Sequence, residues 1–586
     1  MNSIKKKANG FFLVLLFICQ SVTLSSQIAS DFAPCQEMPA IIERYNADEQ
    51  AISRFYSPVV TGGGGFNRGG PASSPGSPEK KERLKVLYYQ YLDKLEKLSF
   101  ANLPQECKAD YILLKRDLNE KLRLAAKDSL EFSKVKEWFL FNDKIYALEK
   151  LRRRGTQPDP SKIAKDFEAI SGEISKSTIA LKDNKTLSIT SIRKALETIS
   201  GLQSSLKSVF DFYYGYDPMF TWWVPKVYTE LDKNLTGYAA EWQKKQVADK
   251  NGIFPRDPAG NEELINLLKY EMIPYTPEEI TRIANEEFAW CEKEMLKASA
   301  EMGFGKDWKA AVEKVKNSYV PPGKQPEAIL KLYNESIDFI KKNDLITIPP
   351  LAEEVWGMNM MSAERQRTNA FFTGGADITI SYPTNTMDHE FRMMSMRGNN
   401  PNFSRATVHH ELIAGHNLQA FVNSRTRIYR RFGTPFWTEG WSLYWELILW
   451  DMKFPQTPEE KVGMLFWHMH RCARIIFSFQ FHTGKWTPQQ CIDFLVDKVG
   501  HERANAESEI RGPLSGNANP LYQVAYLTGG RQFYALKKEL VESKKMSYRQ
   551  FHDSIMKLNA MPVEMIRAIL TNQPLTSDFK TNWKFY

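Results

Sequence analysis

Apolar residues recur at three- and four-residue spacing along most of the chain. The runs at 80–98 and 142–154 are typical of amphipathic helices, and prolines and glycines separate such runs over residues 31–350. A further helix is predicted to begin near Ser404, a suitable N-cap, and helical patterns return from Trp437 onward. The pattern therefore predicts a mainly α fold.

One short segment has a different period. Ile378, Ile380 and Tyr382 alternate with polar residues, which predicts a strand at 377–383. Pro383 confines this strand to a sheet edge or a strand end, because proline lacks the backbone N–H that a central strand needs.

A stretch rich in glycine, proline and serine lies at 61–81. It lacks the G-x-x-x-x-G-K-[ST] spacing of a phosphate-binding loop, so we interpret it as a flexible loop within one helical domain that spans 27–586.

The amino terminus resembles a secretory signal. Three lysines precede the apolar run at 11–18, and small or polar residues follow up to Ser26. We expect cleavage near Ser26 and an exported, periplasmic protein with no transmembrane segment, because no later run has 18 consecutive apolar residues. Lipid attachment at Cys19 is the weaker alternative, since the small residues expected before a lipid-modified cysteine are missing.

Charge and cysteine content exclude some function classes. Removing residues 1–26 removes three lysines and no acids, so the formal charge falls from +9 to +6 over a long chain of mixed charges. This argues against a nucleic-acid partner. The five remaining cysteines are scattered and form no C-x-x-C pair for zinc or redox chemistry. They are Cys35, Cys107, Cys291, Cys472 and Cys491.

The candidate chemistry lies at 408–416, which reads VHHELIAGH. Two histidines and a glutamate on one helix are similar to the H-E-x-x-H signature, in which the histidines bind zinc and the glutamate is the general base. We assign His410 and His416 as ligands and Glu411 as the base. The alternative is a chance cluster of surface histidines.

The spacing does not suit a regular helix. His410 and His416 are six residues apart, so an ideal helix separates their directions by about 240°. His409 and His416 share a face but stand about 10.5 Å apart along the axis, too far for one ion. We therefore predict a bulge at Ala414-Gly415 that returns His416 to the face of His410.

A second segment, 437–446, supplies the third ligand. Glu439 follows His416 by 23 residues, in an aromatic-rich helix where a charged group needs a partner. Glu446 lies seven residues further on the same face and either orients a ligating histidine or binds the ion itself. The alternative for both is a solvent-facing glutamate.

Four motifs in order, HHELIAGHNLQ (409–419), TEGWSLYWE (438–446), 474–494 and PLYQVAYLTGG (520–530), resemble the bacterial family called domain of unknown function 885. The similarity is strongest over 370–535. That family resembles, more distantly, helical zinc peptidases of the angiotensin-converting-enzyme and thimet-oligopeptidase type. The resemblance implies a large helical zincin-like fold with a deep channel, and a small sheet beside the metal helix whose edge strand, 377–383, pairs with a peptide.

The chain departs from the family pattern at two positions. Ala414 replaces the family's proline, and Ser478 stands where an aspartate is usual. His482 and Tyr526 match family positions, and both residue types can stabilise a developing oxyanion. Each can equally be an ordinary core residue.

These observations favour an exported metallopeptidase that holds one Zn²⁺ with His410, His416 and Glu439 and hydrolyses short peptides. Two alternatives stay open: an inactive binding protein of the cell envelope that keeps the fold, and a metal-dependent hydrolase of another amide.

Overall fold

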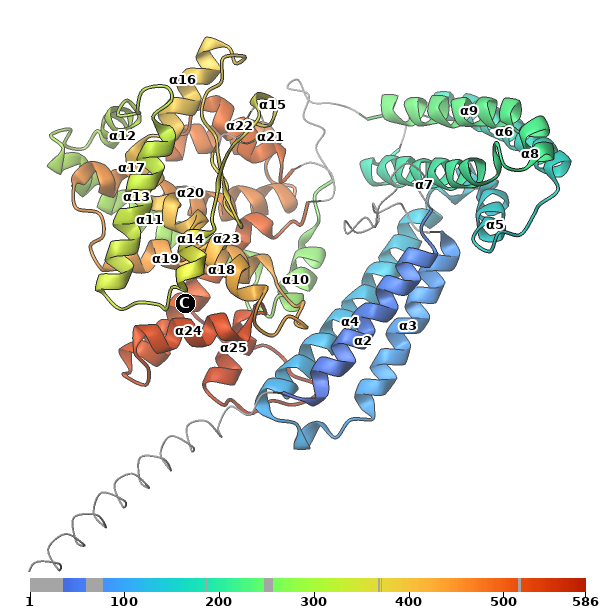
Figure 1. Ribbon diagram of the computed structural model, residues 1–586. Helices are drawn as coiled ribbons and strands as arrows, with labels where there is room; N and C mark the ends of the chain where they lie inside the picture. Colours follow the sequence, from blue (N-terminus) through green and yellow to red (C-terminus); the bar gives the residue numbers. More distant parts are fainter. Residues whose placement is uncertain are drawn as a thin grey trace, which may run out of the picture.

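A computed structural model describes residues 35–58, 77–184, 187–246, 257–366, 369, 371–514 and 518–586. The described chain is almost entirely helical, which confirms the mainly α class (Figure 1). The signal segment, Cys19 and residues 61–76 of the glycine-rich stretch lie outside the described residues.

The first three described helices lie side by side in Figure 1. They are α2 (Glu37–Phe55), α3 (Pro78–Glu96) and α4 (Gln105–Ser133). Helix α3 matches the predicted run at 80–98, but it begins earlier, because the Ser77 side chain caps it by accepting the N–H of Lys80. Residues 78–81 therefore belong to a helix and not to the predicted loop. A disulfide between Cys35 and Cys107 links the start of α2 to α4.

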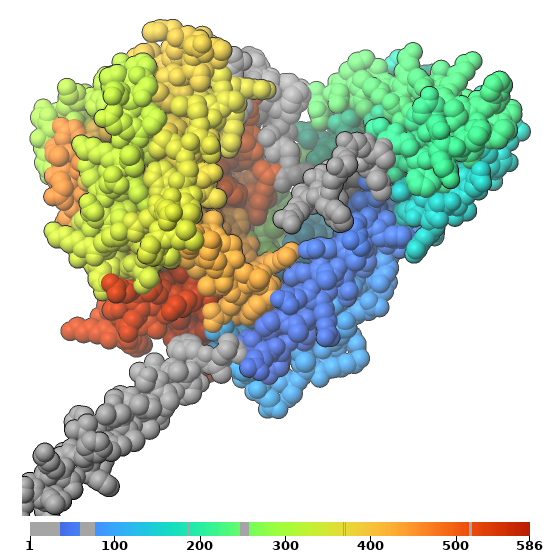
Figure 2. Space-filling view, in the orientation of Figure 1, coloured from blue at the N-terminus to red at the C-terminus, as the bar shows by residue number. Residues whose placement is uncertain are grey.

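The next five helices form a unit with its own hydrophobic core, in which Phe167, Leu202 and Trp242 are buried. They are α5 (Asn142–Arg152), α6 (Pro160–Asp183), α7 (Ile189–Tyr213), α8 (Pro218–Trp223) and α9 (Pro225–Lys244). Figures 1 and 2 show this unit standing to one side of the remaining chain.

The remaining helices form the larger body. They are α10 (Asn261–Tyr270), α11 (Pro277–Glu301), α12 (Trp308–Lys316), α13 (Gln325–Lys342), α14 (Pro350–Glu354), α15 (Ala363–Gln366), α16 (His389–Gly398), α17 (Pro401–Glu411), α18 (His416–Asn423), α19 (Pro435–Asp451), α20 (Pro458–His482), α21 (Pro488–Phe494), α22 (Arg503–Arg511), α23 (Tyr522–Lys537), α24 (Tyr548–Leu558) and α25 (Val563–Leu570). Among the described helices, none is long and apolar enough to cross a membrane.

Buried ion pairs fasten α4 to the larger body. Arg430, in the loop before α19, donates to Asp110 at 2.7 Å and to Glu106 at 3.0 Å, and all three side chains are buried. The charges are paired and hydrogen-bonded, which is the condition for keeping them out of water.

The sheet has two strands, β1 (Met358–Met360) and β2 (Ile378–Ile380), which pair in parallel with Met358 opposite Ile378. The predicted strand is therefore present but shorter. Its other edge is also taken, because Thr379 exchanges two backbone hydrogen bonds with Thr373. The expectation that 377–383 offers a free edge to a peptide is wrong at these positions, and the segment ending at Gly374 lies nearer the site.

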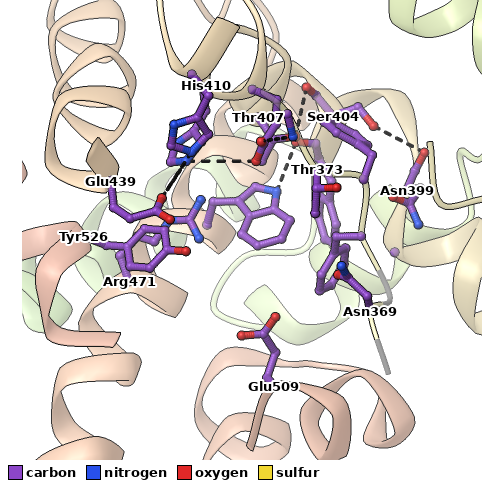
Figure 3. A pocket seen from close by; sticks show the side chains of 18 of the residues that line it. Asn369, Thr373, Asn399, Ser404, Thr407, His410, Glu439, Arg471, Glu509 and Tyr526 are labelled. Atoms are coloured by element: carbon purple, nitrogen blue, oxygen red, sulfur yellow. Dashed lines mark hydrogen bonds and ion pairs between the residues drawn. The ribbon is translucent and has the colours of Figure 1, made fainter. Parts of the chain in front are cut away.

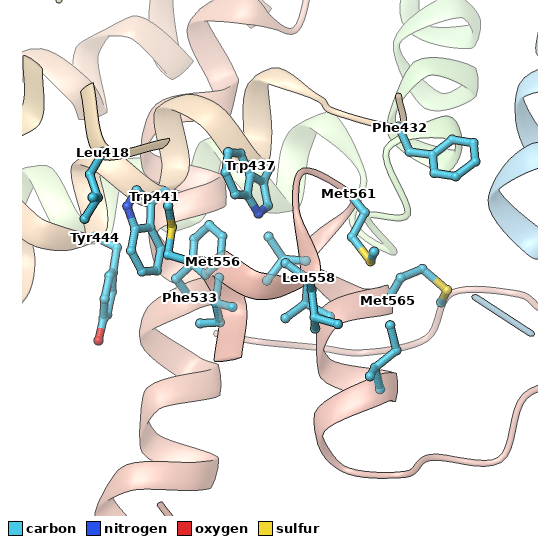
Figure 4. Packing of buried hydrophobic residues seen from close by; sticks show 14 of the residues in the cluster. Leu418, Phe432, Trp437, Trp441, Tyr444, Phe533, Met556, Leu558, Met561 and Met565 are labelled. Carbon is cyan, nitrogen blue, oxygen red and sulfur yellow. The ribbon is translucent and has the colours of Figure 1, made fainter. Parts of the chain in front are cut away.

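Helices α19 and α23 pack together at the centre of the larger body. A Cβ on Gly529 would lie 2.1 Å from the carbonyl oxygen of Phe436, and one on Gly440 would lie 2.6 Å from Gly529. Only glycine permits this approach. Trp437 and Trp441 of α19 pack with Phe533 of α23 and with α24 in one core (Figure 4). Phe436 and Val524 face a second core.

Candidate active site

Helix α17 carries the first part of the motif. It begins at Pro401, where the Asn400 side chain caps it by accepting the N–H of Phe403, so the predicted start at Ser404 is three residues late. It ends at Glu411, just after His410.

The helix is interrupted between α17 and α18, as the spacing of the histidines predicted. Residues 412–415 are not helical, and α18 starts at His416 itself. The N–H of Gly415 donates to the carbonyl of His409 at 2.9 Å, and a Cβ on Gly415 would lie 1.9 Å from the carbonyl oxygen of His410. Glycine is therefore required here for close approach of the backbone. The Trp441 indole donates to the Ala414 carbonyl at 2.8 Å and ties the break to α19.

The break brings three side chains together from three helices. Glu439 Oε2 lies 3.4 Å from His410 Nε2 and 3.3 Å from His416 Nε2. The three candidate ligand atoms all lie within 4.8 Å of one another. Figure 3 shows His410 and Glu439 directed at each other on the cavity wall.

Each histidine is held through its other ring nitrogen. His410 Nδ1 lies 2.7 Å from Glu446 Oε1, and His416 Nδ1 lies 3.1 Å from Gln419 Oε1. Arg471 donates to the same Glu446 oxygen at 3.2 Å. Burial opposes ionisation of Glu446, but Arg471 and His410 outweigh it and lower its pKa to about 2. Glu446 thus contacts the candidate ligand His410 and lies outside the cluster, which is the arrangement expected of a residue that orients a metal-binding histidine.

These contacts leave a place for a cation. Acceptors at both Nδ1 atoms favour protons there, so the Nε2 atoms of both rings are turned toward Glu439 Oε2, a buried oxygen with no hydrogen-bond partner in the described chain. Burial lowers the pKa of His416, but the nearby Glu439 carboxylate outweighs this and raises the pKa to about 9, so without a metal ion a proton occupies the place of the cation. Three acceptors that converge on one point suit a metal ion, and two imidazoles with one carboxylate are a usual set for catalytic zinc.

Glu411 lies beside this cluster without joining it. Its Oε1 is 4.0 Å from His410 Nε2, and its Oε2 accepts the backbone N–H of Gly374. A Cβ on Gly374 would lie 2.2 Å from the Glu411 carbonyl oxygen, so glycine allows this segment to pass directly over the end of α17.

The cluster lines a cavity of ≈ 250 Å³. Tyr526 of α23 stacks on His410, with ring centroids 6.2 Å apart and planes 15° apart. Arg471 of α20 lies beside the Tyr526 ring (Figure 3). Arg474 also lies against this ring and pairs with Glu509 at 2.6 Å. Burial raises the pKa of Tyr526 well above its usual value, so its hydroxyl keeps its proton.

Two of the histidines singled out in the sequence lie elsewhere. His482 is buried at the end of α20, where its Nδ1 accepts the N–H of Ala259 at 3.4 Å, and it does not line the cavity. Its predicted role at an oxyanion is therefore wrong. His409 is fully buried against Phe454 and lies outside the ligand cluster.

Some cavity residues were missed by the sequence analysis. Tyr522 donates to Glu439 Oε1, and Thr373 and Gly374 form part of the wall. Arg471 and Arg474 could have been found, because two arginines one turn apart in a strongly apolar helix need buried acidic partners.

The sequence matches, over residues 72–570, the family described as "Bacterial protein of unknown function (DUF885)". The chain belongs to this family. The motifs of the site lie inside the matched region of this DUF885 protein, and the match covers most of its length.

Solved structures show the same fold for the DUF885 protein. One, described as a "putative lipoprotein of unknown function" from Shewanella oneidensis, superposes with a TM-score of 0.62 at 16% identity and covers 92% of this chain and 100% of that one. Another, described as a "putative lipoprotein" from Colwellia psychrerythraea, has a TM-score of 0.56 at 15% identity and covers 92% and 98%. No curated protein gives a significant match.

Proposed function

We propose that this protein is an exported zinc-dependent peptidase that acts on short peptides. The observation that carries the proposal is the convergence of His410, His416 and Glu439 on one point in a cavity wall, with Glu411 beside them. Three protein ligands leave a fourth position for water or substrate, which is the arrangement of catalytic zinc sites.

The ion would be held by the two Nε2 atoms and Glu439 Oε2. A zinc ion in such a site supplies a Lewis acid that polarises a carbonyl and lowers the pKa of water to about 7. Glu446 keeps His410 Nδ1 protonated and thereby directs the Nε2 lone pair into the site.

Glu411 is the proposed general base. The Gly374 N–H fixes one of its carboxylate oxygens, and the other faces the ligand cluster. From there it can accept the proton of the attacking water and later deliver it to the leaving amine. The Tyr526 hydroxyl, protonated at neutral pH, is the proposed donor to the oxyanion.

The cavity limits the size of the substrate. A volume of ≈ 250 Å³ is at the small end of ligand sites, so it admits a few residues of an extended chain and excludes a folded protein.

Three observations support export. They are the signal-like residues at 1–26, the buried Cys35–Cys107 disulfide, which is typical of oxidising compartments, and the description of both structural relatives as lipoproteins.

The test measures bound zinc and cleavage of a mixed short-peptide library by mass spectrometry. Glu411→Gln should keep its zinc and lose about 10²–10⁴-fold in rate, because it removes only the base. Glu439→Ala should lose the zinc held by His410 and His416, and its activity with it. Glu390→Gln, an exposed position on α16, is the matched control and should change neither.

Two outcomes would contradict the assignment. If Glu439→Ala binds zinc as tightly as the unmodified protein, the ligand set is wrong. If Glu411→Gln retains full activity or loses its zinc, Glu411 is not the base.

A further inference from the structure

A second group of metal-binding side chains lies between α11 and α20, away from the candidate active site. Helix α11 contributes Glu287 and Cys291, and α20 contributes His468 and Cys472. Within each pair the residues are four positions apart, so both side chains of a pair project from the same face of their helix. Two facing helices with such pairs can present four ligands to one point, as metal sites in helical bundles do.

Three of these four side chains already lie close together between the two helices. One ligand atom each from Cys291, His468 and Cys472 lies within 4.8 Å of the others. Glu287 is not one of these three, but its Oε2 lies 3.1 Å from His468 Nε2. Ligand atoms around tetrahedral zinc are about 3.5–3.8 Å apart, for bonds of about 2.1–2.3 Å, so the three gathered atoms need small shifts and the Glu287 carboxylate must turn toward the two sulfurs.

The environment suits a dehydrated ion. Cys291 and Cys472 are completely buried, and Glu287 and His468 are 5% and 9% exposed. The Trp290 ring covers His468 at 5.3 Å, and the Arg531 guanidinium pairs with Glu287.

We propose that Cys291, Cys472, His468 and Glu287 bind a structural Zn²⁺ that joins α11 to α20. Two thiolates and the Glu287 carboxylate carry three negative charges, and Zn²⁺ with Arg531 carries three positive ones, so the filled site is neutral with His468 uncharged. Binding releases to solvent the protons that the two thiols and the metal-binding nitrogen of His468 carried. No redox step is involved.

The site would stabilise one wall of the active-site cavity. Arg471, which lines that cavity, is the neighbour of Cys472 in α20. A metal bond from α20 to α11 would fix the helix that carries Arg471 and Arg474.

Cobalt(II) distinguishes this site from the proposed catalytic one. A thiolate bound to Co²⁺ gives an intense charge-transfer band in the near ultraviolet, and the His410, His416 and Glu439 cluster contains no sulfur. The purified chain, stripped of metal and titrated with Co²⁺, should develop this band at one equivalent per chain. Glu439→Ala should keep the band, so failure of the proposed function leaves this result unchanged.

Cys472→Ser should lose the band. The matched control is Cys491→Ser, because Cys491 is also a buried free thiol, but its sulfur lies 3.8 Å from the Phe477 carbonyl and outside the group. This variant should keep the band at full intensity.

Two results would overturn the proposal. One is the absence of a charge-transfer band in the folded unmodified protein, which decides the matter even when a cysteine variant fails to fold. The other is a second disulfide, between Cys291 and Cys472, because it leaves no thiolates to bind metal. It would show as an intact mass lower by four hydrogens than that of the fully reduced chain, two of which are due to the Cys35–Cys107 bond.

Discussion

Replacement of Glu446 by glutamine tests the candidate active site without touching a ligand. Glu446 accepts from His410 Nδ1 at 2.7 Å and from Arg471 at 3.2 Å, and its pKa of about 2 means that it is charged at neutral pH. Glutamine keeps the carbonyl that orients His410 but removes the charge that makes its imidazole a stronger ligand. Partners of this kind contribute about 10–100-fold to metal affinity, or roughly 1.4–2.7 kcal/mol.

Because the amide still accepts one hydrogen bond, we expect Glu446→Gln to weaken zinc binding by roughly tenfold and Glu446→Ala by roughly a hundredfold. The assay is a competition titration against a chromophoric zinc chelator. A Cys472→Ser background confines the titration to the site of His410 and its partners.

The matched control is Glu149→Gln. Glu149 is also buried and paired with two arginines, Arg152 at 2.7 Å and Arg153 at 2.6 Å, but it lies in α5, in the separate helical unit. It should lower stability and leave zinc affinity unchanged. Equal affinity in folded Glu446→Gln and the unmodified protein, or equal weakening in the control, would refute the reasoning.

Three further predictions concern Gly415, Glu271 and Tyr526. In the Cys472→Ser background, Gly415→Ala should abolish zinc binding while circular dichroism stays helical, because its Cβ meets the backbone of α17. Gly172→Ala in the same background, with no atom within 4 Å of the new Cβ, should bind zinc normally. Burial raises the pKa of Glu271 to about 7, so the folded protein keeps a proton that the unfolded chain releases near pH 4.5. The free energy of unfolding should therefore decrease as the pH rises from 4.5 to 7. Glu271→Gln should remove this decrease of roughly 3 kcal/mol, measured by urea denaturation at several pH values. Tyr526→Phe should lower turnover by about 10²–10³-fold with zinc retained, whereas His482→Gln should leave peptide turnover unchanged.

The helical class and the interruption of the helix before His416 could be predicted because they depend on local patterns. Three- and four-residue periodicity reports helices directly, and the mismatch between a six-residue spacing and the helical repeat predicted the break before His416. The reason for the break was less accessible. The sequence suggested unusual backbone angles at Gly415. The structure shows instead that the backbone of Gly415 passes close to the carbonyl of His410, and this contact depends on the path of the chain between α17 and α18.

Features that depend on distant segments were predicted less well. His482 matches a family position, but whether a histidine on α20 faces the cavity depends on how α20 rotates against its neighbours. The gathering of Cys291 with His468 and Cys472 joins residues nearly two hundred positions apart, and no short motif marks it. The strand edge was misjudged because the partner of Thr379 is Thr373, six residues earlier, in a segment without strand periodicity.

The glycine contact between α19 and α23 limits which parts of the protein can move against one another. No layer of side chains separates these two helices at Gly440 and Gly529, so sliding or rotation of one against the other meets backbone atoms at once. Glu439 and Tyr526 lie on this rigid pair, and each helix is anchored in both cores. Any opening of the cavity must then come from segments outside this helix pair. We expect amide hydrogen exchange in α19 and α23 to wait for global unfolding.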